Sequence, residues 1–487
     1  MAELPQPSSV PSSNWLARRL WWIVPAGLVA SVVAVYGQTA RHELLTWDDL
    51  QHIVANPNVN PPSWAGVARS WREPYWGLYA PLSYTWFAAE AALALRRAPD
   101  GTTRLDPAVF HLGNVLLHAG STLLVYWLLR RLLARSFAPA ACWTPARASP
   151  SAIALESCAS QAPATPTGAP SAASPATILA CGAAAALFAL HPVQVESVAW
   201  VSEGRGLLCA FWSLVALWQW VVYWQSGDGR AAVRHYAAAT AAYVLALLSK
   251  PAAVAVPLMA GVLAVGWFPA PSSAEASGRS WRAAARSLAP WFVGAAAWTV
   301  LTKLLQPDAD ADFVAPWWAR PLVAGDALAF YLSKLVAPWG LCPDYGRSPR
   351  WVMAQGTFYV AWLVPAALVA SLACLRGRRV WLTAVGLSVA WLVPVLGFVP
   401  FEYQRISTVA DRYLYLAMFG PALALAWLLR QGLTARGDAP TPRGATEDAT
   451  RAKAPSAPAD LGDGSRGPGS TGETRGNLPQ SPAEQRP

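Results

Sequence analysis

The sequence predicts an all-α polytopic membrane protein, and two features of its composition carry that prediction. Of its 487 residues, 54% are hydrophobic and only 13% are charged, whereas soluble domains carry roughly 25% charged residues. The chain also contains 27 tryptophans, a residue that favours the lipid–water boundary because its indole ring has both an apolar face and an N–H. Apolar runs near the length of a membrane helix recur along the chain, so we expect about ten transmembrane helices.

The predicted spans follow the apolar runs, several of which are short against the ~20 residues expected. They lie at residues 20–37, 110–129, 176–190, 207–224, 236–249, 251–268, 289–305, 356–375, 381–399 and 413–429. Two further apolar stretches, 78–95 and 326–338, are expected to lie at the membrane interface or to re-enter it. Counting the second of these as a span would place Arg376, Arg378 and Arg379 outside, against the positive-inside rule.

The arginine-rich loops predict an N-terminus in the cytoplasm. That orientation places every basic cluster inside, as the positive-inside rule requires, and the opposite orientation fails at nearly every loop. The clusters are Arg18/Arg19, Arg130/Arg131/Arg135, Arg230/Arg234, Arg279/Arg282/Arg286, Arg376/Arg378/Arg379 and Arg430. The formal charge of +10 is thereby explained by topology, and no nucleic-acid-binding patch is indicated.

This orientation divides the chain into a cytoplasmic N-terminus (1–19), a transmembrane domain (20–430) and a cytoplasmic tail (431–487). The first helix is interpreted as a retained anchor rather than a cleaved signal peptide. Residues 38–109 form a large first outer loop, which mixes aromatic residues with proline and is expected to fold against the membrane. The Ala/Pro/Ser-rich loop at 138–175 and the tail are expected to be disordered.

Six cysteines are scattered along the chain without a pair at metal-ligand spacing. They are Cys142, Cys158, Cys181, Cys209, Cys342 and Cys374. Neither a disulfide framework nor a structural zinc site is indicated.

Polar residues in unusual settings gather on the predicted outer side. The acids, histidines and amide there are Asp48, Asp49, His111, Asn114, His118, His191, Glu196, Glu203, Asp344, Glu402 and Asp411. Cations accompany them despite the bias that keeps basic residues inside, namely Arg205, Lys250, Lys303, Arg320, Arg405 and Arg412. Any chemistry is therefore expected to be extracytoplasmic, with these cations as the phosphate-binding candidates.

Two adjacent carboxylates, Asp48 and Asp49, follow the first span at the point where a helix would leave the membrane. Ionised carboxylates are costly in hydrocarbon, so acids at such a boundary usually line a wet cavity, pair with cations or do chemistry. The alternative is a pair of solvated loop residues.

A polar stripe is expected near the outer end of the second span. His111, Asn114 and His118 have the spacing i, i+3 and i+7, which places all three on one side of a helix. They could bind a metal or sugar hydroxyls, although such residues more often form hydrogen bonds between helices. His191 and Glu196 pose the same choice, and Glu196 is the stronger candidate for a functional role because burying an acid is costly.

Several ordered motifs resemble the membrane portion of bacterial tetratricopeptide-repeat O-mannosyltransferase-like proteins, over roughly residues 20 to 430. The motifs are Trp47-Asp48-Asp49 with Asn56-Pro57 and Val59, Pro81-Leu82-Ser83-Tyr84, Phe110-His111 with Asn114 and Leu117-His118, Ala189-Leu190-His191-Pro192 with Glu196-Ser197-Val198-Ala199-Trp200-Val201-Ser202-Glu203, Leu248-Ser249-Lys250-Pro251, and Ala410-Asp411-Arg412-Tyr413-Leu414-Tyr415-Leu416. Several motifs in the same order are far more specific than any one of them.

The resemblance implies a GT-C glycosyltransferase, an all-helical enzyme of the bacterial inner membrane that acts on its extracytoplasmic side. Such enzymes move a sugar, mannose in the named family, from a polyprenyl or dolichyl phosphate to a hydroxyl of a protein or lipid. An aspartate of the first outer loop serves as general base in that class, which points to Asp48 or Asp49. The partners implied are the lipid-linked donor, a protein or lipid acceptor and membrane lipids.

The expected chemistry also needs cations for the leaving phosphate. Lys250, Arg405 and Arg412 can supply that charge, and arginine offers a planar fork that matches phosphate oxygens. Alternatively, these cations pair with Asp411, Glu402 or Glu203. His111, Asn114, His118, His191, Glu196, Glu203 and Arg205 are the supporting or substrate-binding candidates.

A divalent metal is a further open question. Asp48, Asp49 and Glu196 could offer the hard oxygen ligands that Mg²⁺ or Mn²⁺ accept. The sequence favours neither the presence nor the absence of a metal.

The chain departs from the family pattern at three places. Gly204-Arg205-Gly206 stands where relatives commonly carry Arg-Lys-Asp, Ala80 stands where an arginine is frequent, and the tail shows no repeat array. Donor or acceptor choice is therefore expected to differ. A lipid or glycolipid transporter and a catalytically silent scaffold remain as alternatives, although no inverted repeat of the kind found in transporters is visible.

Overall fold

The computed structural model describes residues 13–97, 103–134, 174–227, 229–268, 281–305 and 314–437. The predicted disordered loop at 138–175 lies outside these residues, except for its last two positions. The predicted tail begins at residue 431, but α16 (Phe419–Gly437) extends past that point, so the start of the tail is helical. The rest of the tail, from residue 438, lies outside the described residues.

The described chain is almost entirely helical. Its longer helices are α1 (Ser13–Tyr36), α3 (Pro81–Ala94), α4 (Pro107–Ala134), α5 (Pro175–Leu190), α7 (Gly204–Gln225), α8 (Arg230–Ser249), α10 (Trp281–Leu305), α11 (Arg320–Val336), α13 (Leu363–Cys374), α14 (Arg378–Leu392) and α16. Shorter helices are α2 (Trp64–Ser70), α6 (Val195–Ala199), α9 (Val256–Val262), α12 (Pro349–Ala354) and α15 (Leu414–Ala417). A small antiparallel hairpin of β1 (Leu95–Arg97) and β2 (Thr103–Leu105), which the sequence analysis missed, connects α3 to α4.

Seven helices among the described residues are long and apolar enough to cross a membrane, or up to nine if two bent pairs each count as one span. Each of the other predicted runs overlaps one of these helices or bent pairs, although the helices begin up to eight residues earlier, and the run at 251–268 forms the shorter apolar helix Pro251–Trp267. Neither α3 nor α11, which cover most of the two predicted interfacial stretches, is among the candidate spans. The prediction of an all-α polytopic membrane protein is therefore confirmed.

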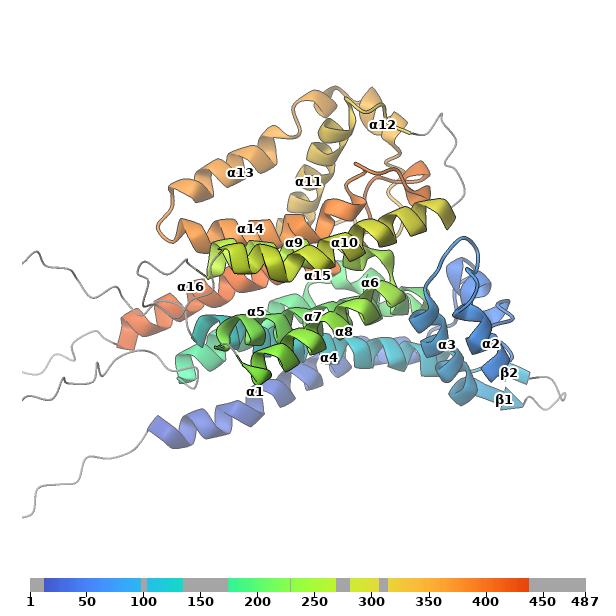
Figure 1. Cartoon of the computed structure of the whole chain (residues 1–487), viewed down its shortest axis with the longest axis horizontal. Helices are drawn as coiled ribbons and strands as arrows, with labels where there is room; N and C mark the ends of the chain where they lie inside the picture. The colour runs from blue at the N-terminus through green and yellow to red at the C-terminus, as the bar shows by residue number, and fades with distance from the viewer. Residues whose placement is uncertain are drawn as a thin grey trace, which may run out of the picture. The chain divides into compact units, whose positions relative to one another are not determined.

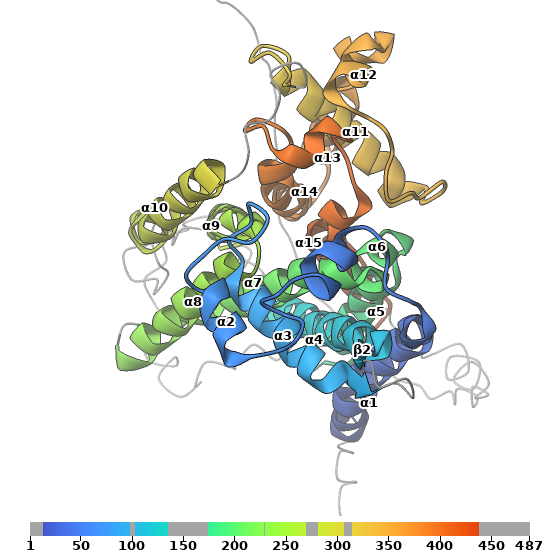
Figure 2. The same ribbon diagram turned by 90° about the vertical axis from the view of Figure 1, so that its right-hand side faces the viewer.

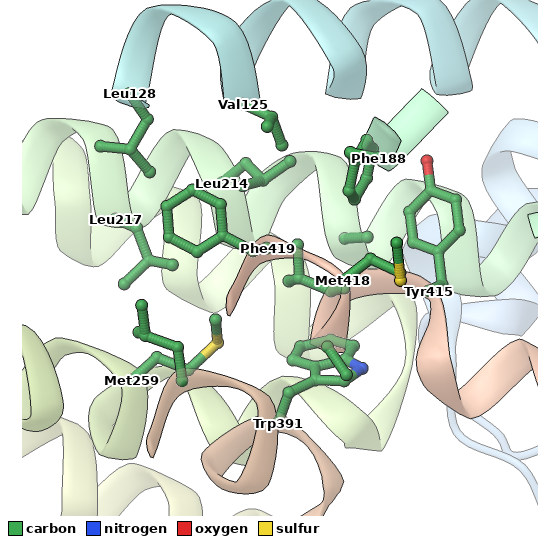
Figure 3. Close-up of a cluster of buried hydrophobic side chains, with 14 of the residues drawn as sticks. Val125, Leu128, Phe188, Leu214, Leu217, Met259, Trp391, Tyr415, Met418 and Phe419 are labelled. Atoms are coloured by element: carbon green, nitrogen blue, oxygen red, sulfur yellow. The ribbon is translucent and has the colours of Figure 1, made fainter. Parts of the chain in front are cut away.

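The long helices pack side by side in a bundle (Figure 1). Within it, α7 packs against α4 and α8, α5 packs against α1, α4 and α16, and α14 packs against α9 and α16. Figure 3 shows where these helices meet: side chains such as Leu128, Phe188, Leu217, Met259 and Phe419 fill one continuous apolar core. The apolar stripes that the sequence places on separate helices thus bury one another.

The segment between α1 and α4 covers one end of the bundle, where α2, α3 and the β hairpin gather (Figures 1 and 2). It has a small core of its own, built around Ile53, Tyr84, Phe87 and Phe110. Gly66 allows α2 to pack closely here, because a Cβ at that position would lie 2.6 Å from the Asn58 carbonyl oxygen. The predicted first outer loop is therefore a folded cap, and we call it the first-loop segment.

Candidate functional site

Two helix breaks bring charged residues from distant parts of the chain to the same place. The helix α5 is followed, at a bend of 51°, by the short arm Pro192–Ala199, which carries Glu196. The helix α16 is preceded, at a bend of 44°, by the short arm Asp411–Ala417, which carries Arg412. Pro192 explains the first break because proline has no N–H with which to continue the hydrogen-bond ladder of α5.

Glu196, Arg412, Glu203 and Lys250 form a chain of alternating charges. Arg412 donates to Glu196 through its backbone N–H at 2.7 Å and through Nη1, and its Nε lies 3.6 Å from Glu203 Oε1. Lys250 Nζ donates to both carboxylate oxygens of Glu203, at 2.8 and 3.0 Å. The side chains of both glutamates and Arg412 are 7% exposed, whereas that of Lys250 is 27% exposed. Each buried charge is therefore paired, as burial requires.

Aromatic rings surround the Arg412 guanidinium. Its central carbon lies 4.1 Å from the centroid of Tyr403, 5.2 Å from that of Tyr413 and 5.4 Å from that of Trp200. A cation over aromatic faces gains electrostatic attraction that increases when water is excluded. The rings therefore hold Arg412 in one position without neutralising its charge.

Asp49 is a fully bonded, buried acceptor. Asp49 is only 1% exposed. Its Oδ1 accepts from the backbone N–H of Ser202 at 2.8 Å and from the Ser202 hydroxyl at 2.5 Å. Its Oδ2 accepts from the backbone N–H of Leu45 at 2.9 Å. These bonds tie the first-loop segment to the turn before α7, so Asp49 acts as an anchor.

Asp48 lies in a different environment. Its side chain is 42% exposed, and Oδ2 accepts from Arg205 Nη2 at 3.1 Å. Arg205 in turn donates through Nε to the Ser202 carbonyl at 3.1 Å. Ser202 thus bonds to Asp49 directly and is linked to Asp48 through Arg205. Asp49 is buried with both carboxylate oxygens hydrogen-bonded, whereas Asp48 is open to solvent. We call Asp48, Asp49, Glu196, Glu203, Arg205, Lys250 and Arg412 the charged cluster.

His52 and Tyr84 belong to this site, although the sequence analysis assigned a role to neither. The Tyr84 hydroxyl lies 3.0 Å from His52 Nδ1. Burial, assisted by the nearby Arg205 charge, lowers the pKa of His52 to about 2, so the imidazole is neutral. Burial raises the pKa of Tyr84 to about 12. The only sequence signal for His52 is its spacing of four residues from Asp48.

The predicted polar stripe on α4 holds neighbouring segments together. Asn114 donates to the carbonyls of Val198 and Trp200. His118 donates through Nε2 to the Ala189 carbonyl at 3.0 Å, so its Nδ1 accepts from the Tyr415 hydroxyl at 2.8 Å. These contacts favour hydrogen bonding between helices.

The other two histidines of the predicted set are also engaged at helix junctions. His111 is buried, and its ring meets that of His42 edge to face at 6.0 Å between centroids. His191 bonds to the Leu335 carbonyl through Nε2 at 3.2 Å and accepts from the Val193 N–H through Nδ1. His191 thus links the start of the Pro192–Ala199 arm to the end of α11, whereas His111 packs against the residues that follow α1.

Arg405 pairs with Glu402 at 2.7 Å, and both side chains are close to half exposed. This pair is one that the sequence analysis offered as an alternative to phosphate binding, as is the Lys250–Glu203 pair. Asp411, by contrast, accepts from the Tyr345 hydroxyl at 2.9 Å.

Within the part of the chain that the structure describes, no group of three or more His, Cys, Asp and Glu side chains is arranged to hold a metal ion. The carboxylates of Asp48, Asp49 and Glu196 are engaged instead by Arg205, Ser202 and Arg412. A site for Mg²⁺ or Mn²⁺ therefore stays a prediction.

The two glycines that depart from the family pattern have a packing role. A Cβ at Gly206 would lie 2.5 Å from Glu203 Oε2 and 3.3 Å from Lys250 Nζ. A Cβ at Gly204 would lie 2.7 Å from Asn114 Oδ1. A larger residue at either position would displace the groups that hold the cluster, so these glycines match this particular arrangement of charges.

The fold and this site define a polytopic helical membrane protein with a buried ion-pair cluster beside one exposed carboxylate. No family model matches the chain, and neither a curated protein nor a solved structure matches it significantly. The functional conclusion therefore rests on the chemistry of the cluster and on the sequence motifs.

Proposed function

We propose that this protein is a membrane glycosyltransferase of the GT-C type, which moves a sugar from a polyprenyl-phosphate donor to a hydroxyl of a protein or lipid. The observation that carries the proposal is the position of Asp48, a solvent-open carboxylate beside a cluster of three cations. Lys250, Arg205 and Arg412 come from separate parts of the chain and join that cluster through Glu203, Asp48 and Glu196.

Asp48 is the proposed general base. The acceptor hydroxyl must lose a proton as it attacks the anomeric carbon, and the base must be reachable from solvent. Asp48 meets that requirement with its 42% exposed side chain, whereas the oxygens of Asp49 are occupied by Ser202 and Leu45. The pair thus divides between a base and an anchor that holds the base in place.

Lys250 is the proposed first contact of the donor phosphate, and Arg412 provides deeper positive charge. The leaving phosphate gathers negative charge as the bond to the sugar breaks, so cations held in advance lower the barrier. Lys250 is the more accessible of the two, at 27% against 7% exposed. Both cations are paired with glutamates, which keeps them in place at modest net charge until a phosphate binds.

The order of motifs along the chain supports the same proposal, since each motif of the resemblance contributes to the cluster or to its immediate contacts. Asp48 and Asp49 come from the first motif, Glu196 and Glu203 from the fourth, and Arg412 from the last. On this proposal the protein lies in the bacterial inner membrane, with the charged cluster on the extracytoplasmic side, as the basic loops predict.

A lipid or glycolipid transporter is the second candidate, because broken helices are a feature of transporters and two bent pairs carry charges here. The exposed carboxylate favours the enzyme, since a transport site needs no open base. A scaffold without catalytic activity predicts that Asp48 can be replaced without consequence.

The test is sugar transfer by purified protein in liposomes, given a panel of labelled polyprenyl-phosphate sugars and a membrane extract as acceptor. Wild type, Asp48→Asn and Glu402→Gln are compared at matched folding. Glu402 is a suitable control because it is an exposed carboxylate paired with Arg405. Transfer by wild type and the control, and its loss in Asp48→Asn, would support the enzyme and identify the donor.

Two other outcomes would contradict this assignment. Equal transfer by all three proteins would show that Asp48 is not the base. Movement of the labelled donor across the liposome membrane without transfer would favour the transporter.

A further inference from the structure

Trp47 has no role in the mechanism above, although it directly precedes Asp48 and is 54% exposed. Its ring meets that of Trp200 edge to face, with centroids 5.9 Å apart and planes at 69°. Trp200 in turn packs against the Arg412 guanidinium at 5.4 Å. An exposed indole is therefore the chain neighbour of the proposed base and is linked to the buried cation through Trp200.

Trp47, Asp48 and Asp49 are all held against one short piece of chain. Trp47 contacts Trp200, Asp48 contacts Arg205, and Asp49 contacts Ser202. In a regular strand, consecutive side chains would point to opposite faces, but the turn here keeps the three together. The exposed ring of Trp47 and the exposed carboxylate of Asp48 are therefore both held against residues 200–205.

We propose that Trp47 is the platform on which the sugar of the donor stacks, and hence a specificity-determining residue of the site. This inference rests on the proposed glycosyltransferase function. A pyranose ring has a face of C–H groups that packs well on an indole, while the hydroxyls at its rim bond to polar neighbours. Aromatic walls with a few placed polar groups are the usual lining of small-molecule sites.

Trp200 prepares this platform before the sugar arrives. Its edge-to-face contact restricts the orientation of the Trp47 ring, so less side-chain freedom is lost when a ligand binds. The same Trp200 contacts Arg412, which links the sugar platform to the phosphate side of the site. One donor molecule can thus place its sugar on Trp47 and its phosphate toward the cations.

An exposed tryptophan at a membrane protein's surface could equally serve as an interfacial anchor, and the experiment separates the two roles. Binding is measured in nanodiscs for polyprenyl phosphates carrying mannose, glucose, galactose or an N-acetylhexosamine, and for the sugar-free polyprenyl phosphate. The variants are Trp47→Leu, Trp47→Phe and Trp64→Leu. Trp64 is the matched control because it lies on α2 in the same segment and is 88% exposed.

The expected result is that wild type binds one sugar-bearing lipid more tightly than the sugar-free lipid. Trp47→Leu should weaken the affinity for the sugar-bearing lipid about tenfold, since an aromatic contact contributes about a factor of ten to binding. The affinity for the sugar-free lipid should not change. Trp47→Phe should retain most of the preference for the sugar-bearing lipid over the sugar-free lipid. Trp64→Leu should retain all of that preference.

Three results would overturn the inference. Equal losses in Trp47→Leu and Trp64→Leu, or equal losses for both kinds of lipid, would show an anchor. Unchanged binding in Trp47→Leu would show that the sugar rests elsewhere. If wild type binds no polyprenyl phosphate at all, the proposed function fails and takes this inference with it.

Discussion

Arginine lies over aromatic rings at both ends of the bundle, but its surroundings differ. In the charged cluster, Arg412 lies over Tyr403 and is also paired with Glu196. At the other end of α4, Arg130 lies 4.1 Å from the Trp21 ring centroid and 4.9 Å from that of Trp127. Nearby, Arg430 donates to the Leu133 carbonyl at 2.7 Å. We call this second region the arginine end.

The comparison teaches that aromatic rings can position a buried arginine in either region, and that in the charged cluster Glu196 and Glu203 add an ordered set of charges around it. Arg130 and the side chain of Arg412 are both buried, and aromatic rings stabilise each of them. At the charged cluster, the carboxylates of Glu196 and Glu203 pair with Arg412. At the arginine end, the rings and backbone carbonyls hold cations where the positive-inside rule expects anchors. Substitutions in the two regions test whether they differ in function or only in composition.

The largest expected effect concerns the two neighbouring aspartates of the cluster. Asp48→Asn should lower the rate of sugar transfer by about 10²–10⁴-fold, the usual contribution of a general base. Its thermal midpoint should fall only modestly, because the side chain is 42% exposed and an amide oxygen at that position can still accept from the buried Arg205. The measurement is initial transfer rate together with thermal unfolding in detergent.

Asp49→Asn should show the opposite pattern. An amide placed there would direct N–H groups at a backbone donor, either Leu45 or Ser202, which costs about 1–3 kcal/mol. A lower thermal midpoint is therefore expected. If Asp49→Asn instead abolishes transfer at unchanged stability, the assignment of base and anchor is reversed.

Glu203→Gln should cost about 3 kcal/mol of unfolding free energy, because it removes a buried carboxylate shared by the buried Arg412 and the partly exposed Lys250. Lys250 and Arg412 both lose a partner in this variant. Thermal unfolding checks the loss, and the double variant Glu203→Gln/Lys250→Met should recover part of it. A single variant as stable as wild type would mean that water already screens this pair.

Arginine-to-lysine exchange compares the two ends directly. Arg412→Lys should lower kcat/KM for transfer by about 10²-fold, since lysine loses the planar fork and a cation aimed at developing charge is worth that much. Arg130→Lys, the same change on a similar bed of rings, should leave kcat/KM within about threefold of wild type. Equal losses in the two variants would remove the functional distinction between the ends.

The smallest expected effect is a pH dependence of stability that comes from His52. Its pKa is about 2 in the folded protein, against ~6.5 when unfolded. Below pH 6.5 the unfolded chain therefore binds up to one more proton than the folded chain, and stability falls as the pH falls, with a slope that approaches about 1.4 kcal/mol per unit. His52→Gln should show a shallower fall in thermal midpoint between pH 6.5 and 5. Parallel curves would show that His52 is not buried as a neutral ring.

The helices could be predicted from sequence because their signals are local. An apolar run and the arginines beside it are read over about 20 residues, so the candidate spans follow from adjacent residues. The hairpin of β1 and β2 was missed because its strands are short and exposed. The bends of 51° and 44° were missed because apolar runs look alike whether straight or broken.

The sequence alone determined the class of the protein and a set of residues that contains the whole charged cluster. Only the tertiary structure decided which members of that set pair, that Asp49 is an anchor while Asp48 is open, and that His52 and Tyr84 adjoin Arg205. The reason is physical: hydrophobicity and charge act on each segment separately, whereas burial and hydrogen bonding depend on partners far away. Ser202, which distinguishes the two aspartates, lies 153 positions from Asp49 and meets it only in the folded chain.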